Sequence, residues 1–480
     1  MDNKKVISNL FWRFMERVGA QGVTFIVSII LARLLDPNVY GIIALVTVFT
    51  AILQVFVDSG LGTALIQKKE VDDVDYSSVF YVNIFICIVL YCGMFFSAPF
   101  ISKFYGIEEL TPVIRVMSLT IVVAGIKNVQ QAYVARNLMF KKFFLSTLGG
   151  TIGAAIIGIV LALLGFGVWA LVAQYLFNIT VDTIILWLTV EWRPICAFSL
   201  DRLKSLYSFG WKIFVASLLE TFYQQLRSLV IGKMYTTSDL AFYNKGKQFP
   251  DLIATNINIS IDSVLLPTMS QQQDNITRLK DMTRRAIKTG SYVMMPMLVG
   301  LAMCAEPFIK LLLTEKWLPC VPFMRVFCLI YIFYPINTAN LNAIRAMGRS
   351  DLTLKLGIIK KIIGLAALLG TLKIGVMAIA YGELIANLLC QFVNAWPNKK
   401  LLKYSYHEQM KDILPYLFMS CSMGAIVYAI SFLQINNYAV LFLQITAGII
   451  FYIVLSIVLK VDSFIYVRDS LLNYLKKDDK

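Results

Sequence analysis

Long apolar runs dominate the hydropathy pattern of the chain, and a short polar connection separates each run from the next. A helix needs about 20 apolar residues to cross a hydrocarbon core of about 30 Å. Fourteen runs have this length. The predicted spans are 8–34, 39–66, 78–104, 110–135, 143–165, 167–190, 205–233, 239–268, 286–312, 319–345, 352–372, 375–397, 412–434 and 437–459. The pattern therefore predicts an all-α integral membrane protein with about 14 transmembrane helices.

The composition agrees with a membrane protein and excludes a soluble globule. Hydrophobic residues make up 58% of the 480 residues and charged residues 15%, with a mean hydropathy of +0.70, whereas a soluble domain carries about 25% charged residues. The formal net charge is +15. Because the basic residues gather in connections on one side of the predicted membrane, they follow the positive-inside bias rather than indicating nucleic acid as a partner. This asymmetry places both termini in the cytoplasm.

The sequence offers little material for an active site. His407 is the only histidine and the eight cysteines form no CxxC pair, so neither a His-based metal site nor a Ser/His/Asp triad can be assembled. The sequence contains no GxxxxGK[ST] phosphate-binding loop. We therefore expect no enzymatic activity, no metal and no cofactor.

An internal duplication relates the two halves of the chain. Shifts of 200 and 210 residues align Ala32–Gly41 with Ile231–Asn244, Phe56–Ile66 with Asn256–Leu266, and Thr111–Leu119 with Val321–Leu329. Because the second copy begins six spans after the first, the halves are parallel repeats, an arrangement that in transporters places the substrate site between them. We predict an N-terminal lobe at 1–200 and a C-terminal lobe at 201–400, each of six helices, around a central cavity. An extra helix pair and a cytoplasmic tail follow at 401–480.

Polar and ionisable residues inside the spans concentrate in spans 1, 2 and 4 and in their repeat partners 7, 8 and 10. Each ionisable group costs at least about 2.5–3.5 kcal/mol to insert, and Lys and Arg outnumber Asp and Glu. The pattern predicts a water-filled, cationic cavity that suits an anionic head group. The candidate substrate-binding residues are Arg13, Arg17, Lys212, Arg227, Lys245, Gln224 and Asn256, and the candidates for coupling to a proton or sodium gradient are Asp58 and Glu220.

These candidates also have structural interpretations that the sequence leaves open. Arg13 and Arg17 are consistent with snorkelling to the membrane interface, and Glu220 and Arg227 with an ion pair that seals two helices. Asp58 is equally consistent with a hydrogen-bonded structural role beside small residues. The basic residues of span 8 are consistent with solvated ion pairs.

Three segments carry a family resemblance. They are FWRFMERVGAQGVTFIVSIILARLLDPNVYG (Phe11–Gly41), DSGLGTALIQ (Asp58–Gln67) and FGWKIFVASLLETFYQQLRSLVIGK (Phe209–Lys233). In these segments the chain resembles the polysaccharide-transporter flippases of the multidrug/oligosaccharidyl-lipid/polysaccharide superfamily, and in particular the lipopolysaccharide O-antigen and colanic-acid-type exporters. The first turn reads Asp36-Pro37-Asn38, and the turn that corresponds to it in the second repeat, 235–238, lacks the proline.

The resemblance implies a multi-pass protein of the bacterial inner membrane that moves undecaprenyl-diphosphate-linked sugar repeat units to the periplasmic leaflet. Membrane lipid and the polysaccharide polymerase machinery are the partners expected besides the lipid-linked oligosaccharide. A lipid II flippase remains an alternative, because it shares the lobe architecture and the sign of the cavity. A cation-coupled multidrug exporter of the same superfamily is a second alternative, although its cavity should hold more carboxylates than basic groups.

Overall fold

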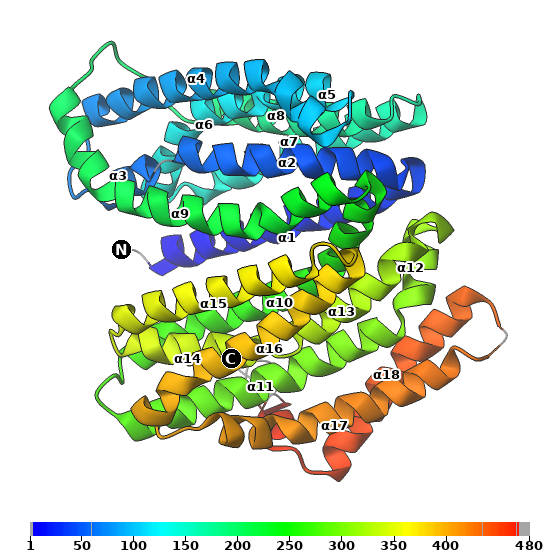
Figure 1. The fold of residues 1–480 in the computed structure, drawn as a ribbon. Coiled ribbons are helices and arrows are strands. Elements are labelled where there is room, and N and C mark those ends of the chain that lie inside the picture. The colour runs from blue at the N-terminus through cyan, green and yellow to red at the C-terminus, as the bar shows by residue number, and fades with distance from the viewer. Residues whose placement is uncertain (1–2, 59, 434, 467, 470–480) are drawn as a thin grey trace. The chain divides into compact units, whose positions relative to one another are not determined.

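A computed structural model describes residues 3–58, 60–433, 435–466 and 468–469 (Figure 1). All regular elements in these residues are helices, and they divide by their contacts into two compact units, Met1–Ala241 and Phe242–Lys480. The first unit contains α1 (Asn3–Leu34), α2 (Pro37–Asp58), α3 (Leu61–Gln67), α4 (Asp73–Tyr105), α5 (Leu110–Met117), α6 (Leu119–Arg136), α7 (Phe140–Leu163), α8 (Val168–Thr189) and α9 (Leu200–Met234).

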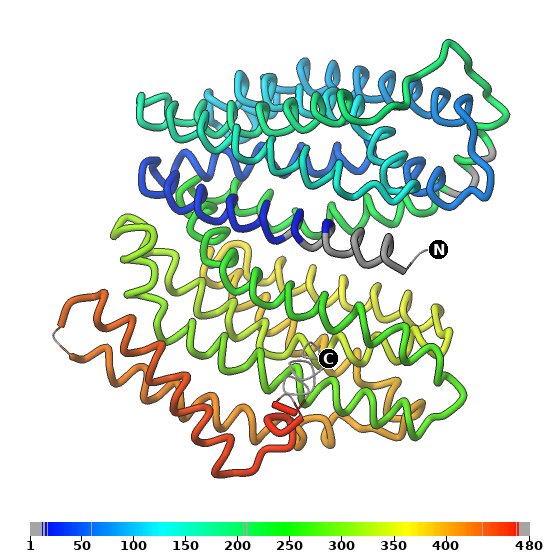
Figure 2. Tube along the Cα trace, turned by 180° about the vertical axis from the view of Figure 1, so that it is seen from behind, coloured from blue at the N-terminus to red at the C-terminus, as the bar shows by residue number. Residues whose placement is uncertain are grey.

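The second unit contains nearly all of α10 (Thr237–Ser270), followed by α11 (Ile276–Met303), α12 (Ala305–Leu313), the short 3-10 helix η1 (Glu315–Cys320), α13 (Val321–Tyr331), α14 (Tyr334–Ala346), α15 (Ser350–Thr371), α16 (Val376–Leu401), α17 (Tyr406–Ile430) and α18 (Asn437–Val458). The last two helices form an antiparallel pair, and α17 packs along α11 (Figures 1 and 2). They match the last two predicted spans.

Eleven helical segments among the described residues are long and apolar enough to cross a membrane, so the chain is a multi-pass membrane protein. The other three predicted spans correspond to α1, α9 and α15, helices of 32, 35 and 22 residues. Together these three carry thirteen Lys and Arg against four Asp and Glu. Their length fits a membrane crossing, but their charge is too high for a helix surrounded by lipid, so their assignment as spans stays a prediction.

Paired features in the two units agree with the aligned segments of the sequence. In both units a helix break interrupts the fourth span of the repeat, between α5 and α6 and between α13 and α14. Arg115 Nε donates to Phe95 O on α4 at 3.2 Å, and Arg325 Nε donates to Ala302 O on α11 at 3.3 Å. The turns after α6 and α14 each contain a left-handed residue, Leu138 at φ 54° and Gly348 at φ 71°.

In each of the two aligned turns two residues separate the helices, although only the first turn is followed by a proline. Pro37 opens α2, while Thr236 precedes α10. Thr236 and Asp239 cap α10 reciprocally: Asp239 N donates to Thr236 Oγ1 at 3.1 Å and Thr236 N donates to Asp239 Oδ2 at 3.2 Å. The start of α10 is thus stabilised by a side-chain cap, whereas the start of α2 is stabilised by the fixed φ of proline.

Helix α9 packs antiparallel to α2 along its length. Phe56 and Phe214 pack edge to face with ring centroids 4.9 Å apart near one end, and a Cβ on Gly232 would lie 2.2 Å from Leu45 Cδ2 near the other. The division between the two units therefore falls 41 residues after the predicted lobe boundary at 200, because α9 packs its glycines against other helices of the first unit. The predicted lobes describe the sequence repeat, and they stay a prediction.

Candidate functional site

Four of the predicted site residues share one part of the circumference of α9. The face of α9 against α2 and Gly60 holds Gly210, Phe214 and Gly232. At 100° per residue Lys212, Glu220 and Arg227 point away from this face, and Gln224 lies at its edge. Lys212, Glu220 and Gln224 are exposed and Arg227 is partly buried. We call Lys212, Glu220, Gln224 and Arg227 the α9 polar face.

Side chains within the α9 polar face contact one another and a neighbouring aromatic ring. Gln224 Nε2 donates to Glu220 Oε1 at 3.1 Å. The Arg227 guanidinium lies 5.9 Å from the centre of the Tyr223 ring, a cation–π distance. The face therefore presents two basic groups, one carboxylate and one amide on a helix of membrane-spanning length.

The two predicted residues on α10 have contrasting surroundings. Lys245 is 6% exposed, and its ammonium lies 5.7 Å from the centre of the buried Trp317 ring. Asn256 is exposed, and its amide donates to Leu252 O one turn earlier at 2.8 Å. Lys245 thus packs inside the second unit, whereas Asn256 presents its side chain at the surface. The side chains of Arg13 and Arg17 lie outside the described residues.

Asp58 lies at an interruption of the second span. It is the last residue of α2, and Gly60 adopts a left-handed φ of 70° before α3 begins. Asp58 is exposed, and its Oδ1 accepts from Gln54 Nε2 at 3.2 Å. Interrupted spans are where transporters of several folds bind ions and substrates.

A buried ion pair lies next to Asp58. Lys127 Nζ on α6 donates to Asp182 Oδ2 on α8 at 2.9 Å, and the two side chains are 15% and 9% exposed. The neighbouring Asn128 donates through Nδ2 to Val57 O at 2.7 Å, which brings this turn of α6 against the end of α2. Neither Lys127 nor Asp182 is among the residues that the sequence predicts for the site. The signal was present, since an aspartate in an otherwise apolar span is a functional candidate by default.

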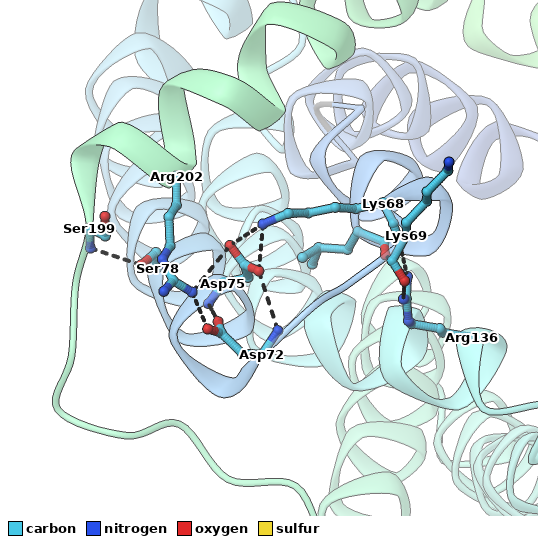
Figure 3. Close-up of polar contacts among 9 residues, drawn as sticks. Lys68, Lys69, Asp72, Asp75, Ser78, Arg136, Ser199 and Arg202 are labelled. Atoms are coloured by element: carbon cyan, nitrogen blue, oxygen red, sulfur yellow. Dashed lines mark hydrogen bonds and ion pairs between the residues drawn. The ribbon is translucent and has the colours of Figure 1, made fainter.

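A second polar cluster holds one end of the first unit together (Figure 3). Lys68 Nζ bonds both carboxylate oxygens of the buried Asp75 at 2.6–2.7 Å, while Arg202 pairs with Asp72. The Arg202 hydrogen bond lowers the pKa of the Asp72 carboxyl below its usual range. Ser199 N donates to Ser78 Oγ at 3.0 Å.

Arg136 completes this cluster from α6 (Figure 3). It donates to four backbone carbonyls, those of residues 65, 66, 68 and 69, at 2.6–3.2 Å. These oxygens lie where α3 ends and have no helical partners of their own. The cluster of Figure 3 thus ties the α3–α4 connection to α6 and to the start of α9. The polar groups of the cluster bond one another, so we assign the cluster a structural role.

Comparison with known proteins supplies the family. The profile of the polysaccharide biosynthesis protein family matches residues 30–322. The chain belongs to this family. It is 26% identical over 326 residues to the succinoglycan biosynthesis transport protein ExoT of Rhizobium meliloti (strain 1021), covering 68% of this chain and 66% of the relative. It is 23% identical to the lipopolysaccharide biosynthesis protein WzxC of Escherichia coli (strain K12), covering 88% of each.

Solved structures define the fold of this polysaccharide biosynthesis protein. The lipid II flippase MurJ in its inward closed conformation matches 98% of this chain and 100% of its own, with a TM-score of 0.72 and 17% identity. An inward-facing multidrug resistance transporter of the MATE family matches 83% of this chain and 99% of its own, with a TM-score of 0.63 and 16% identity. The chain therefore has the fold shared by MurJ and the MATE transporters, and the resemblance to the polysaccharide flippases is confirmed.

Proposed function

We propose that this protein translocates an undecaprenyl-diphosphate-linked oligosaccharide, the repeat unit of an O-antigen, capsule or exopolysaccharide, across the bacterial inner membrane by alternating access. The names of the relatives support a role in exporting polysaccharide precursors. The fold supports transport rather than catalysis, since it is shared with a flippase and with exporters. Both termini are proposed to lie in the cytoplasm, because the basic connections gather on that side.

The observation that carries this proposal is the charge of the three polar helices. Helices α1, α9 and α15 have spanning length yet hold thirteen basic against four acidic residues. Such helices are stable in a bilayer only where their charged faces meet water, protein or a charged ligand. A net positive surface suits a diphosphate, which Arg forks and Lys ammonium groups bind well. Lys355, Lys360 and Lys361 are the basic residues of α15.

The same charge balance bears on the alternatives. A multidrug exporter for cationic compounds needs carboxylates in its cavity, and the polar helices hold few. A lipid II flippase shares both the fold and the diphosphate, so only the sugar distinguishes it. The relatives act in succinoglycan and lipopolysaccharide biosynthesis by name, which favours a polysaccharide repeat unit.

The test is transport in proteoliposomes that contain a fluorescent undecaprenyl-diphosphate oligosaccharide. The fraction of label reaching the opposite leaflet is measured for the natural chain, for Arg227→Glu and for Lys204→Glu. Lys204 is an exposed basic residue of α9 outside the polar face, so its reversal is a matched change of charge. We expect Arg227→Glu to reduce the initial rate at least tenfold and Lys204→Glu to change it less than twofold.

Three results would overturn the proposal. Equal rates for the natural chain and Arg227→Glu would remove the cationic face from substrate binding. Efflux of cationic dyes without movement of the labelled lipid would identify a multidrug exporter. Lipid II supplied in the same vesicles tests the other alternative, and a rate above that for the oligosaccharide lipid would make the protein a lipid II flippase.

A further inference from the structure

The buried ion pair of the first unit has a neutral counterpart in the second. Lys127 on α6 bonds Asp182 on α8, and the 210-residue shift that aligns Arg115 with Arg325 also aligns Lys127 with Asn337. Asn394 Nδ2 on α16 donates to Asn337 Oδ1 on α14 at 2.9 Å. Helices α14 and α16 occupy the places of α6 and α8 in the repeat. The same pair of helices is therefore joined by a charged bond in one unit and by an amide bond in the other.

The contact to the second helix of each repeat lies at corresponding positions and is made by neutral groups in both units. In the first unit Asn128 donates to Val57 O, one residue before Asp58. In the second unit Thr338 Oγ1 donates to Asn258 Oδ1 at 3.1 Å, and the 200-residue shift aligns Asn258 with Asp58. The charged positions of the first unit, Asp58, Lys127 and Asp182, thus correspond to three asparagines of the second, Asn258, Asn337 and Asn394.

The packing of α6 against α8 does not by itself require the charges of Lys127 and Asp182. The second unit shows that neutral amides can join α14 to α16, and a buried ion pair is often no more stabilising than neutral groups of similar size. Charges inside a span are costly to insert and are retained where they serve transport. The first unit keeps three of them together, at the point where its second span is interrupted.

The charges around the cluster define which ion it can exchange. Two carboxylates face one ammonium, so the cluster lacks one positive charge for neutrality. Asp58 is exposed, whereas Asp182 is buried and its Oδ1 has no hydrogen-bond partner among the described residues. On α4 the buried Cys87 packs in one apolar cluster with Val57, and Lys212 of α9 points away from α2. Because the Lys127 ammonium lies beside the carboxylates, it repels a metal cation, whereas a proton can be bound by a single carboxylate oxygen.

We propose that Asp58, Lys127 and Asp182 form the proton-coupling site of this transporter, with Lys127 as a counter-ion shared by the two carboxylates. The proposal rests on the transport function proposed above. A proton that adds to the exposed Asp58 carboxylate makes it neutral, and Lys127 then pairs with Asp182 as in the structure. When Asp58 loses that proton, its carboxylate competes for the ammonium and draws α6 toward α2 and away from α8. The protonation state of Asp58 is thereby linked to the packing of three helices.

The first test compares transport with and without an imposed pH gradient. Labelled undecaprenyl-diphosphate oligosaccharide is followed in proteoliposomes, and the ratio of the two rates is taken for each variant. The informative variant is Lys127→Asn with Asp182→Asn, which installs the amide pair of the second unit and removes one positive and one negative charge together. Its matched control is Lys310→Gln with Glu315→Gln, which removes an exposed pair 2.7 Å apart. We expect the ratio to fall from at least tenfold to about one in the first variant and to persist in the control.

The second test reads the proton without any substrate. Infrared difference spectra of the reconstituted natural chain, recorded across a pH titration, should show a protonated carboxyl band that Asp58→Asn removes and the control pair leaves in place. A band unchanged in Asp58→Asn would overturn the proposal. The proposal would also be overturned if the double-asparagine variant kept the natural chain's ratio of transport rates with and without the pH gradient. It would be overturned as well if the natural chain moved the labelled lipid at the same rate with and without the gradient. Failure of the natural chain to move the labelled lipid would instead overturn the proposed function, while the infrared titration would still decide the proton site.

Discussion

Gly41 occupies the closest approach between the beginning of α2 and the turn that follows α9. A Cβ at this position would lie 1.9 Å from Thr237 O and 2.4 Å from Thr237 C. Both are backbone atoms, so no side-chain rotation can relieve the contact. Asn38 and Thr237 are also hydrogen-bonded through their side chains at the same place. Gly41→Ala therefore forces the two segments apart by about 1 Å, the difference from the shortest tolerated separation.

The expected cost follows from two opposing terms. Overpacking a tight interface costs about 1–3 kcal/mol, and a backbone clash belongs at the upper end. Replacing glycine by alanine in a helix returns about 1 kcal/mol. The net loss is about 2 kcal/mol, which corresponds to a fall in Tm of about 4–8 °C for a unit of this size.

Thermal unfolding in detergent micelles, followed by tryptophan fluorescence, measures this loss. Gly93→Ala is the matched control, because Gly93 is exposed in α4 and a Cβ there meets nothing within 4 Å. Gly93→Ala should show only the gain in helix propensity, without the clash, and raise Tm by about 2–4 °C. A Tm for Gly41→Ala at or above that of the natural chain would refute the close packing of these two segments.

Three further predictions concern local contacts. Arg136→Met leaves four carbonyls without their donor, so limited trypsin digestion should cut the α3–α4 connection faster than in the natural chain. Thr236→Ala removes the cap of α10 and should lower the free energy of unfolding by about 1 kcal/mol, measured by denaturant titration. Because Arg202 lowers the pKa of Asp72, their contact stabilises the folded state above the ordinary aspartate pKa and is lost as the pH falls below it. The difference in Tm between the natural chain and Arg202→Gln should therefore be present at pH 7 and decrease as the pH falls below the ordinary aspartate pKa of about 3.9.

The sequence was sufficient for the features that depend on composition along the chain. Lipid requires runs of apolar residues with every backbone group bonded internally, so the helical class and most spans could be predicted from hydropathy. The duplication was also readable, because the two copies retain the same turn and arginine positions. Arg115 and Arg325 make corresponding bonds to the preceding long helix, as their alignment suggested.

The tertiary structure decided the surroundings of each polar residue. Lys245 and Lys212 are alike in sequence, both lysines in predicted spans, yet one packs beside Trp317 and the other is exposed. Hydropathy could not distinguish them, because burial depends on which face of a helix meets its neighbours. The attachment of α9 to α2 was equally hidden, since glycines far apart in the chain make the contact possible.

The sequence by itself determined that this chain spans a membrane and carries an excess of basic residues on a few helices, and it predicted a repeat of six helices. Only the tertiary structure brought Lys127 to Asp182 beside Asp58, from positions as many as 124 residues apart. The reason is physical: hydropathy reports the transfer of each residue into lipid, whereas an ion pair depends on distances between helices that the order of residues does not record.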